Sequence, residues 1–286
     1  MPVSAQSFDS RQSMKNNRFE VFHYRDKKMS NVSIHHHDFF EVYFFLTGRV
    51  SYKVEGRSYH LEPGDLLLIN PHELHQPDIG TDTLYERIVL WIDRAYLASL
   101  CSAAGTDLAA CFDNGQPGHT NLLRPNKLRR AALGQLLDRL AREYHSEELG
   151  SFAYAQGLLI QFMVELNRLA QSYGHAQKRE EPDLIGQVLT YIGNHYQENI
   201  TLESLAAHFF VSKYHLSHEF SHRVGTSIYR YVIFRRLLQA RELMLTGQTP
   251  GEVYQTCGFG DYANFYRAFK GEYGISPREF AARVQE

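Results

Sequence analysis

The pattern of hydrophobic and polar residues divides the chain into a region of short strands and a helical remainder. From Phe19 to about Ile92, short runs rich in Val, Ile, Tyr and Phe are separated by turn-forming residues, as in antiparallel sheets. The runs that we predict as strands are FEVFHY, FFEVYFFL, VSYKVE, RSYHLE, DLLLIN and YERIVLWI. Residues 55–57 predict a hairpin turn and residues 61–65 a second tight turn. Short, regularly spaced strands of this kind favour an antiparallel sandwich or barrel.

Two amphipathic helices follow the strands. We predict the first from Asn126 to about Glu148 and the second from Phe152 to Tyr173, because apolar residues recur at three- and four-residue spacing. The apolar stripes comprise Leu128, Ala132, Leu136, Leu137 and Leu140 in the first helix and Ala155, Leu159, Phe162, Leu166 and Leu169 in the second. The break between the helices predicts an antiparallel helical hairpin. Packing on the barrel and a seam between two protomers explain the stripes equally well, and we expect a homodimer whose seam includes Leu159.

Polar residues of mixed charge at positions 175–182 predict a linker between two domains. At about 100–200 residues per domain, a chain of 286 residues accommodates two of them. We therefore predict a two-domain α+β protein. Its N-terminal domain, 1–174, would combine the antiparallel β-barrel with the helical hairpin, and its C-terminal domain, 183–286, would be all-α.

The C-terminal region contains an internal repeat, which becomes visible when the sequence is compared with itself at an offset of 49 residues. The coinciding pairs are Phe210 and Phe259, Ser212 and Asp261, Leu216 and Phe265, Phe220 and Phe269, Gly225 and Gly274, Ser227 and Ser276, and Tyr231 and Phe280. Each copy predicts a short helix, a turn, an N-cap residue and a second helix ended by glycine. The repeat therefore predicts two helix–turn–helix units.

The second helix of each unit, which we call the reader helix, is expected to present polar and aromatic side chains opposite its buried face. These side chains are Lys213, Tyr214, Ser217, His218 and Ser221 in the first copy and Tyr262, Ala263, Asn264, Tyr266, Arg267 and Lys270 in the second. Such a unit has the geometry that enters a DNA major groove, and a solvated face of a helical bundle is the alternative. The whole chain has a net charge of -2, but six basic residues and one acidic residue lie between positions 212 and 241. This local positive charge favours contact with DNA phosphates.

Further motifs lie between Thr201 and Phe280. They are Leu205-Ala206, Ser212-x3-Leu216-x3-Phe220, Arg236-Leu237-x2-Ala240, Cys257-Gly258-Phe259-x-Asp261, Arg267-x-Phe269-Lys270 and Gly274-x-Ser276-Pro277. Together they resemble the DNA-binding domain of AraC/XylS-type transcriptional regulators. The resemblance implies base contacts from Tyr214, Ser217 and His218 in the first reader helix and from Tyr262, Ala263, Asn264 and Arg267 in the second. Lys213, Ser221 and Lys270 are further candidates for DNA contact.

The N-terminal region carries a second group of candidate residues. His35-x-His37-x3-Glu41-x6-Gly48 is followed by Pro63-Gly64-Asp65 and Pro71-x3-His75. On a strand His35, His37 and Glu41 have the same parity, so their side chains would point into the barrel. Together with His75 they could hold a divalent transition metal. Alternatively, these residues and Tyr43 bind an organic ligand without metal.

These histidine and glycine motifs resemble the paired motifs of cupin barrels. Combined with the C-terminal domain, they imply the sensor of a sugar-responsive AraC-type regulator. That resemblance implies a cytoplasmic, non-enzymatic regulator that binds a double-stranded DNA operator, a sugar effector and RNA polymerase, and that activates carbohydrate-utilisation genes. A metal-dependent cupin enzyme fused to a DNA-binding module is the alternative, and a regulator whose pocket has lost its ligand is a third hypothesis.

Composition argues against several other classes of protein. The three cysteines are widely spaced and form no C-x-x-C pair, which argues against a disulfide framework and a thiolate zinc site. No run approaches the ~18 apolar residues that a membrane helix needs, so we expect no membrane partner.

Overall fold

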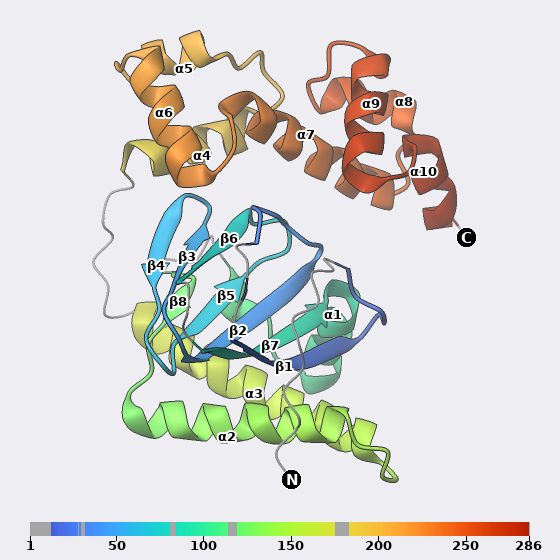
Figure 1. The fold of residues 1–286 in the computed structure, drawn as a ribbon. Coiled ribbons are helices and arrows are strands. Elements are labelled where there is room, and N and C mark those ends of the chain that lie inside the picture. Colours follow the sequence, from blue (N-terminus) through green and yellow to red (C-terminus); the bar gives the residue numbers. More distant parts are fainter. Residues whose placement is uncertain are drawn as a thin grey trace. The chain divides into compact units, whose positions relative to one another are not determined.

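The computed structural model describes residues 13–27, 29, 32–80, 84–113, 119–174 and 183–285. The chain forms two compact units, Met1–Glu180 and Glu181–Glu286 (Figure 1). The predicted linker at 175–182 lies outside the described residues. None of the helices in these ranges is long and apolar enough to cross a membrane.

The N-terminal unit contains two antiparallel sheets, as predicted. Within the described residues its strands are β1 (Phe19–Asp26), β2 (Phe39–Thr47), β3 (Val50–Val54), β4 (Arg57–His60), β5 (Leu66–Ile69), β6 (His75–Ile79), β7 (Tyr85–Asp93) and β8 (Leu122–Leu123). One sheet has the order β1-β7-β2-β5-β8 and the other has the order β4-β3-β6. The prediction did not include β6 and β8, because Pro77 interrupts the apolar pattern of β6 and β8 has only two residues.

Strands β2 and β7 contribute to two different cores, because successive side chains of a strand point to opposite faces of the sheet. Val42 and Leu90, which are paired in register, pack in the core between the large sheet and the helices. Tyr43 and Val89, the next pair, pack in the core between the two sheets. Burying each large apolar side chain contributes roughly 1.5–3 kcal/mol. A one-residue shift of register would exchange the two faces, so both cores hold the strands in place.

The hairpin between β3 and β4 confirms the predicted turn. Val54 pairs with Arg57, which leaves Glu55 and Gly56 as the two turn residues. Their φ angles are 45° and 73°, and positive φ at both positions is the type I′ geometry that matches the twist of the strands. The Glu55 carboxylate also accepts a hydrogen bond from the Leu74 N–H at 2.9 Å. This contact ties the hairpin to the segment that leads into β6.

The helices of the N-terminal unit are α1 (Arg94–Ala104), the 3-10 helix η1 (Ala110–Phe112), α2 (Lys127–Tyr144) and α3 (Ser151–Gly174). α2 and α3 form the predicted antiparallel hairpin beside the large sheet (Figure 1). The predicted stripe of α3 is buried in the core against the sheet. Leu159 is 0% exposed there. The interpretation of Leu159 as part of a dimer seam is therefore wrong.

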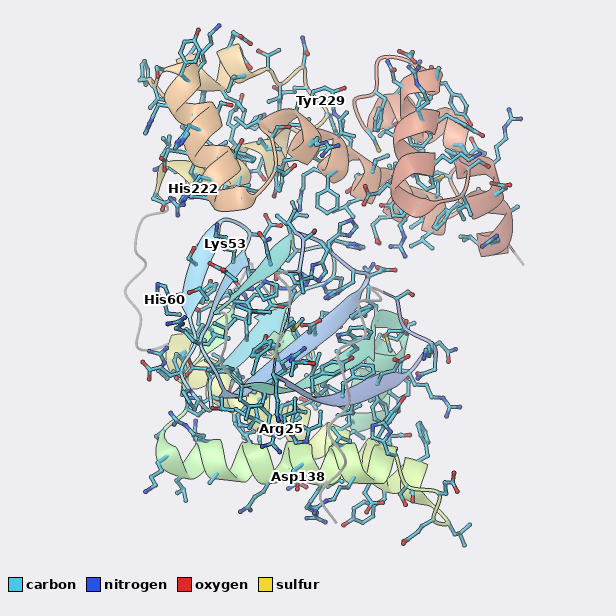
Figure 2. All side chains as sticks on the ribbon, viewed as in Figure 1. Arg25, Lys53, His60, Asp138, His222 and Tyr229 are labelled. Carbon is cyan, nitrogen blue, oxygen red and sulfur yellow. The ribbon has the colours of Figure 1, made fainter. Side chains whose placement is uncertain are left out.

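The buried face of α2 also differs from the prediction. Leu128 is 81% exposed and Ala132 is exposed as well, whereas Leu133 is buried. Steps of four residues advance by about 40° around an α-helix, so Leu128 and Leu140 differ by about 120° in direction. The buried face of α2 therefore begins at Leu133, while Asp138 projects from the surface of the helix (Figure 2).

The described residues of the C-terminal unit form helices joined by turns and short loops. Its helices are α4 (Leu184–His195), α5 (Leu202–His208), α6 (Lys213–Val224), α7 (Ile228–Leu245), α8 (Pro250–Thr256), α9 (Tyr262–Tyr273) and α10 (Pro277–Gln285). The pairs α5–α6 and α8–α9 are the two predicted helix–turn–helix units, and α7 joins them (Figure 1). The reader helices are therefore α6 and α9.

Each reader helix begins and ends at the residues that the repeat predicts. The side chains of Ser212 and Asp261 each accept a hydrogen bond from the backbone N–H three residues later. Such N-caps satisfy an amide that would otherwise lack a partner at the start of a helix. Gly225 and Gly274 end the two helices with φ of 81° and 73°, a left-handed conformation in which a side chain is unfavourable.

The turns of the two units differ in length, and the predicted pairing of Phe210 with Phe259 is wrong. α8 begins 48 residues after α5, whereas α9 begins 49 residues after α6. Phe210 instead corresponds to Gly258, since both have positive φ, 55° and 85°, and Val211 corresponds to Phe259. A Cβ atom at Gly258 would lie 2.5 Å from the carbonyl oxygen of Gln197. Phe210 adopts the same backbone conformation with its side chain 94% exposed.

Helix α7 is shared by the two helix–turn–helix units. Near its start, the ring of Tyr231 lies 5.7 Å from that of Phe220 in α6. Towards its end, Leu237, Ala240 and Met244 belong to the core around α8 and α9. The helix has 18 residues, so it is a rod of about 27 Å. Because its two halves pack in different cores, α7 fixes both units to one rigid element.

Candidate functional site

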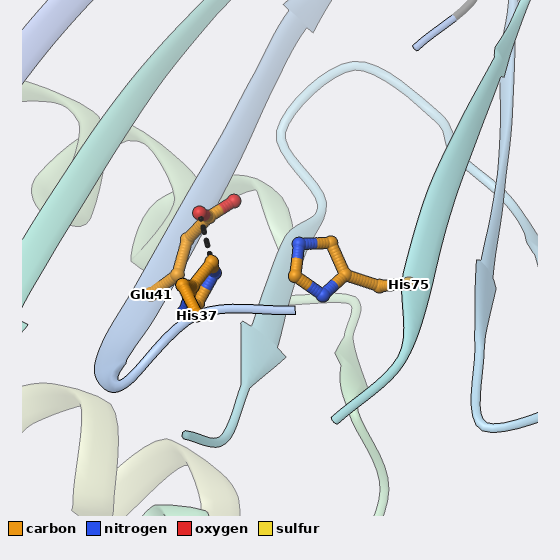
Figure 3. Close-up of side chains that lie close together, drawn as sticks. All are labelled: His37, Glu41 and His75. Carbon is orange, nitrogen blue, oxygen red and sulfur yellow. Dashed lines mark hydrogen bonds and ion pairs between the residues drawn. The ribbon is translucent and has the colours of Figure 1, made fainter. Parts of the chain in front are cut away.

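A buried hydrogen-bonded group lies between the two sheets of the N-terminal unit. The His37 Nε2 atom, just before β2, is 3.1 Å from Glu41 Oε2 (Figure 3). The indole N–H of Trp91, on the neighbouring β7, donates to the same oxygen at 2.8 Å. The other ring nitrogen of His37 is 3.0 Å from the carbonyl oxygen of Phe39. Because a carbonyl oxygen can only accept, Nδ1 is the donor to Phe39, and Nε2 is the ring nitrogen that faces the Glu41 carboxylate.

His75 completes this group from the opposite sheet. It lies at the start of β6, across from the other two side chains in Figure 3. Its Nδ1 is 2.8 Å from the carbonyl oxygen of Glu73. Burial lowers the pKa of His75 well below its usual range, so its imidazole is neutral at pH 7 with a lone pair on Nε2.

The ligand atoms of His37, Glu41 and His75 lie within 4.8 Å of one another. Two imidazoles and a carboxylate at this spacing fit a divalent transition metal. These three residues would hold the ion, and their ligand atoms would have to be deprotonated when it binds.

The fourth predicted metal ligand, His35, lies beside this group rather than in it. Its backbone forms an isolated bridge with His75, and the two rings lie 4.2 Å apart. Its Nδ1 is 2.9 Å from the carbonyl oxygen of Ser33, and burial lowers its pKa. The ring of His36 lies 6.3 Å from His72. The structure therefore brings together three of the four predicted ligands.

A cavity of about 50 Å³ lies beside this group. It has room for roughly three to five water molecules at about 10–15 Å³ each, so an effector of sugar size requires the cavity to widen. The lining residues are Tyr24, Met29, Val32, His35, His37, Glu41, Tyr43, Tyr52, Pro77, Tyr85, Arg87, Val89 and Trp91. Of the predicted ligand-binding residues, only His75 does not line it. The ring of His75 instead contacts those of His35 and His37.

Arg87 is a charged cavity residue that the sequence interpretation missed. Its side chain is 2% exposed and pairs with the carboxylate of Asp26. The guanidinium carbon lies 4.1 Å and 4.8 Å from the ring centroids of Tyr85 and Tyr24. A buried guanidinium is tolerable only with such a counter-charge and ring faces around it. The sequence feature that could have predicted this position is the alternation within YERIVLWI, because it places Arg87 on the same face of the strand as Trp91.

The remaining polar groups of the cavity are phenols. The Tyr43 and Tyr85 hydroxyls are hydrogen-bonded to each other. Burial raises the pKa of Tyr43 and of Tyr52 well above the usual range and raises that of Tyr85 to about 12. All three are neutral at pH 7, and each can donate one hydrogen bond and accept others. The cavity therefore combines hydroxyl groups with one carboxylate and one guanidinium.

The predicted DNA-contacting residues of α6 lie at its surface. Lys213, Tyr214, His218 and Ser221 are exposed and Ser217 is half-buried. Tyr214 is 78% exposed, which is unusual for so large a side chain. The Lys213 ammonium lies 3.7 Å from the carboxylate of Glu203 in α5.

The corresponding residues of α9 differ more in their exposure to solvent. Ala263, Asn264, Arg267 and Lys270 are exposed. Tyr262 is half-buried, because its ring packs 5.7 Å from that of Tyr254 and 5.8 Å from that of Phe265. Most of the Tyr262 ring therefore belongs to the core of the unit.

Two protein families match the two units. Residues 20–163 match the AraC-like ligand binding domain, and residues 205–283 match a helix-turn-helix domain. A ligand-binding barrel followed by two helix–turn–helix units defines a ligand-responsive, DNA-binding transcription regulator. The chain belongs to the AraC family of such regulators. This family is not one of enzymes, in agreement with the prediction.

Several known proteins are similar to the chain. The HTH-type transcriptional activator RhaS of Salmonella schwarzengrund is 27% identical over 248 residues, which cover 86% of each chain. RhaS of Yersinia pestis is 26% identical over 251 residues, which cover 87% of this chain and 89% of that protein. Among solved structures, unsaturated fatty acid bound ToxT of Vibrio cholerae is 16% identical, with a TM-score of 0.42, covering 94% of this chain and 96% of ToxT.

Proposed function

We propose that this regulator activates carbohydrate-utilisation genes when a sugar binds in the cavity of the N-terminal unit. The two RhaS relatives, which are named transcriptional activators, support activation. The mixture of phenol, carboxylate and guanidinium groups around the cavity supports a ligand rich in hydroxyl groups. The observation that carries the proposal is the buried carboxylate of Glu41, which lies on the cavity wall and is held by Trp91 and His37.

A carboxylate held in this way can accept hydrogen bonds from neighbouring hydroxyls of a sugar. Such a site rejects analogues that lack a hydroxyl, because its buried polar groups would then be left unpaired. The sugar changes transcription only to the extent that it binds one arrangement of the regulator more tightly than another.

The test is a panel of sugars and their deoxy analogues with the full-length protein. A ligand that binds only the folded state raises the melting temperature. Trp91 is the single tryptophan of the chain, so a sugar in the cavity should also change its emission spectrum. A sugar that raises the melting temperature without changing this emission binds elsewhere and refutes the proposed site. No response to any sugar would favour a regulator whose pocket has lost its ligand.

We also propose that the same group can hold a divalent transition metal, with His37, Glu41 and His75 as ligands. Elemental analysis of protein purified without a His-tag should find metal in the wild type and less in His75→Gln. Because metal ligands must be deprotonated to bind, occupancy should fall as the pH is lowered. Metal-free wild-type protein would leave recognition of an organic ligand as the role of these residues.

For the C-terminal unit we propose that α6 and α9 read the bases of a double-stranded operator. The proposed contacts are Lys213, Tyr214, Ser217, His218, Ser221, Tyr262, Ala263, Asn264, Arg267 and Lys270. The exposure of most of these side chains supports the assignment. Tyr262 is half-buried, so only the exposed edge of its ring could contact DNA.

Arg267→Ala tests this assignment. If Arg267 reads a base, the substitution should weaken operator binding by ~1–3 kcal/mol and relax the preference at one position. If it contacts a phosphate, all sequences should lose affinity alike and the salt dependence should become shallower. Unchanged affinity would remove Arg267 from the interface, and Tyr214→Ala should affect only the other half of the operator.

We propose that the regulator is a homodimer formed through the outer face of the α2–α3 hairpin. A groove of about 300 Å³ lies there, lined by Arg129, Ala132, Leu133, Gln135, Leu136, Arg139, Gln161 and Glu165. In a symmetric pair, the arginines of one protomer can meet the glutamate of the other. Two protomers on one operator would also bind more tightly than one. Leu128→Glu should give monomers by light scattering, and a persistent dimer would place the interface elsewhere.

Taken as domains, residues 1–174 would sense the ligand and dimerise, residues 175–182 would link, and residues 183–286 would bind DNA. Activation would then require that the regulator contact RNA polymerase. Because the regulator binds operator DNA, we also propose that it acts in the cytoplasm.

A further inference from the structure

Three side chains on the exposed face of α9 form a continuous series of hydrogen bonds. The Asp261 carboxylate accepts through Oδ1 from the Asn264 backbone N–H at 2.7 Å, and through Oδ2 from the Asn264 side-chain amide. The Asn264 carbonyl oxygen accepts in turn from the Arg267 guanidinium. The three residues are spaced three apart, so they lie on one side of the helix, and all of them are exposed.

The chemistry of the three groups fixes the direction of this series. A carboxylate can only accept hydrogen bonds and a guanidinium can only donate them, while an amide does both at opposite ends. Asp261 therefore selects the orientation of Asn264 that turns its NH₂ group towards the helix start. The carbonyl oxygen is then directed towards Arg267. The guanidinium is held along the surface of α9 before any DNA is bound.

The first reader helix is organised differently. Its N-cap, Ser212, has a single side-chain oxygen, which accepts from the His215 N–H at 3.2 Å. The residue equivalent to Arg267 is His218, whose Nδ1 lies 3.6 Å from the Glu219 carboxylate and whose ring stacks on His222 at 6.3 Å. The two caps are thus equivalent for the helix, but only Asp261 supplies a second oxygen to a neighbouring side chain.

We propose that Asp261 is a positioning residue, which presents Arg267 to DNA through Asn264. This inference rests on the proposed function, in which Arg267 contacts the operator. Hydrogen bonds and ion pairs between exposed side chains contribute little to stability. Their effect here is on binding, since an arginine that is already ordered loses less conformational freedom when it meets a base.

The decisive variant is Asp261→Ser in the full-length protein, because serine caps α6 at the equivalent position. The probe is a duplex that the wild-type protein selects from a random-sequence pool. The variant should bind this duplex about twofold to tenfold more weakly, the range expected for one long side chain that must be immobilised on binding. A repeated selection should show a weaker preference at the position read by Arg267.

Simple electrostatics predicts the opposite sign for this substitution. Removing a negative charge from a DNA-binding surface reduces repulsion from the phosphates and should strengthen binding. Stronger or unchanged binding of Asp261→Ser would therefore overturn the proposal. An unchanged melting temperature of the C-terminal unit would show that the cap is intact. If the variant melts earlier, Asp261→Asn, which is also a good cap but lacks the second acceptor, replaces it.

Two controls separate the positioning role from a general one. Ser212→Asp adds the second oxygen in the first unit, where no asparagine follows at the third position, and should leave all base preferences unchanged. In the Arg267→Ala background, Asp261→Ser should have no further effect, and an equal loss in both backgrounds would refute positioning. If Arg267→Ala itself leaves affinity unchanged, the proposed DNA contact fails. If it weakens binding while Asp261→Ser does not, only the positioning role fails.

Discussion

Replacing Glu41 by glutamine should destabilise the N-terminal unit and change the surroundings of its tryptophan. The carboxylate is 5% exposed, and its Oε2 atom lies 2.8 Å from the Trp91 indole nitrogen and 3.1 Å from His37 Nε2. An amide oxygen in the place of Oε2 can accept from both groups, but it is a neutral acceptor, and hydrogen bonds to a neutral group are weaker than those to a charged one. The amide NH₂ group would take the place of Oε1. Removing a charged acceptor from a buried donor costs roughly 1–3 kcal/mol, reduced by relief from burying the charge.

The assay is urea unfolding followed by tryptophan fluorescence. Because Trp91 is the only tryptophan and lies in the N-terminal unit, the signal reports on that unit alone. We expect Glu41→Gln to lower its free energy of unfolding by roughly 1–3 kcal/mol and to alter the native emission spectrum. The same variant should lose effector-dependent transcription while it retains DNA binding.

Glu62→Gln is the matched control for this experiment. Glu62 lies between β4 and β5 in the same unit, its side chain is 63% exposed and it pairs with Arg124 at 3.2 Å. Loss of such a surface pair should change the stability by less than about 1 kcal/mol. If Glu41→Gln behaves like this control, and the emission of Trp91 is that of the wild type, the hydrogen-bonded group at the cavity does not exist as described.

Three further measurements test the packing. Leu159→Ala should lower the stability of the N-terminal unit by roughly 2–5 kcal/mol, since it removes a fully buried side chain. The oligomeric state of this variant, measured by light scattering, should be that of the wild type. Dissociation without loss of stability would show that Leu159 lies in an interface between protomers. Phe210→Gly should raise the thermal stability of the C-terminal unit by roughly 0.5–1 kcal/mol, because glycine tolerates the φ of 55° and the lost side chain is exposed. A lower melting temperature would mean that the phenylalanine makes contacts in the folded state. Burial raises the pKa of Cys257 to about 11 and that of Cys111 further, so at pH 8 both are thiols and iodoacetamide should label Cys101 first by mass spectrometry. Equal labelling of all three would contradict the packing around the buried pair.

The parts of the fold that follow a simple period could be predicted from the sequence. The α3 stripe, with Leu159 at its centre, repeats at three- and four-residue spacing and is buried as a whole. The N-caps Ser212 and Asp261 and the terminal Gly225 and Gly274 act through local backbone geometry, which a short segment determines by itself.

The parts that depend on contacts distant in sequence could not be predicted in the same way. β6 is a strand because it pairs with β3, and its own residues, including Pro77, do not indicate one. Arg87 is buried because Asp26 and two tyrosine rings surround it, whereas an arginine in a sequence is expected at the surface. Phe210 was paired with the wrong residue, because comparison at one fixed offset cannot detect a single additional residue in a turn.

The candidate site falls between these two cases. His37, Glu41 and His75 were expected together and do meet, because β2 and β6 belong to the two sheets that face each other across this core. The geometry that decides their chemistry was not visible, because it depends on the Phe39 and Glu73 carbonyl oxygens beside the two imidazoles. Backbone atoms of this kind carry no signature in a sequence.

Helix α7 also limits how the operator can change over evolution. Because the two reader helices are attached to one continuous rod of 18 residues, their rotational phase around the DNA axis is set by the protein. A single base substitution in an operator costs about 1–3 kcal/mol and leaves the other contacts in place. Adding one base pair between the two sites instead turns one of them by roughly 34–36° relative to the other. The bases of the operator can therefore drift one at a time, whereas the spacing between the two sites can change only together with the length of α7.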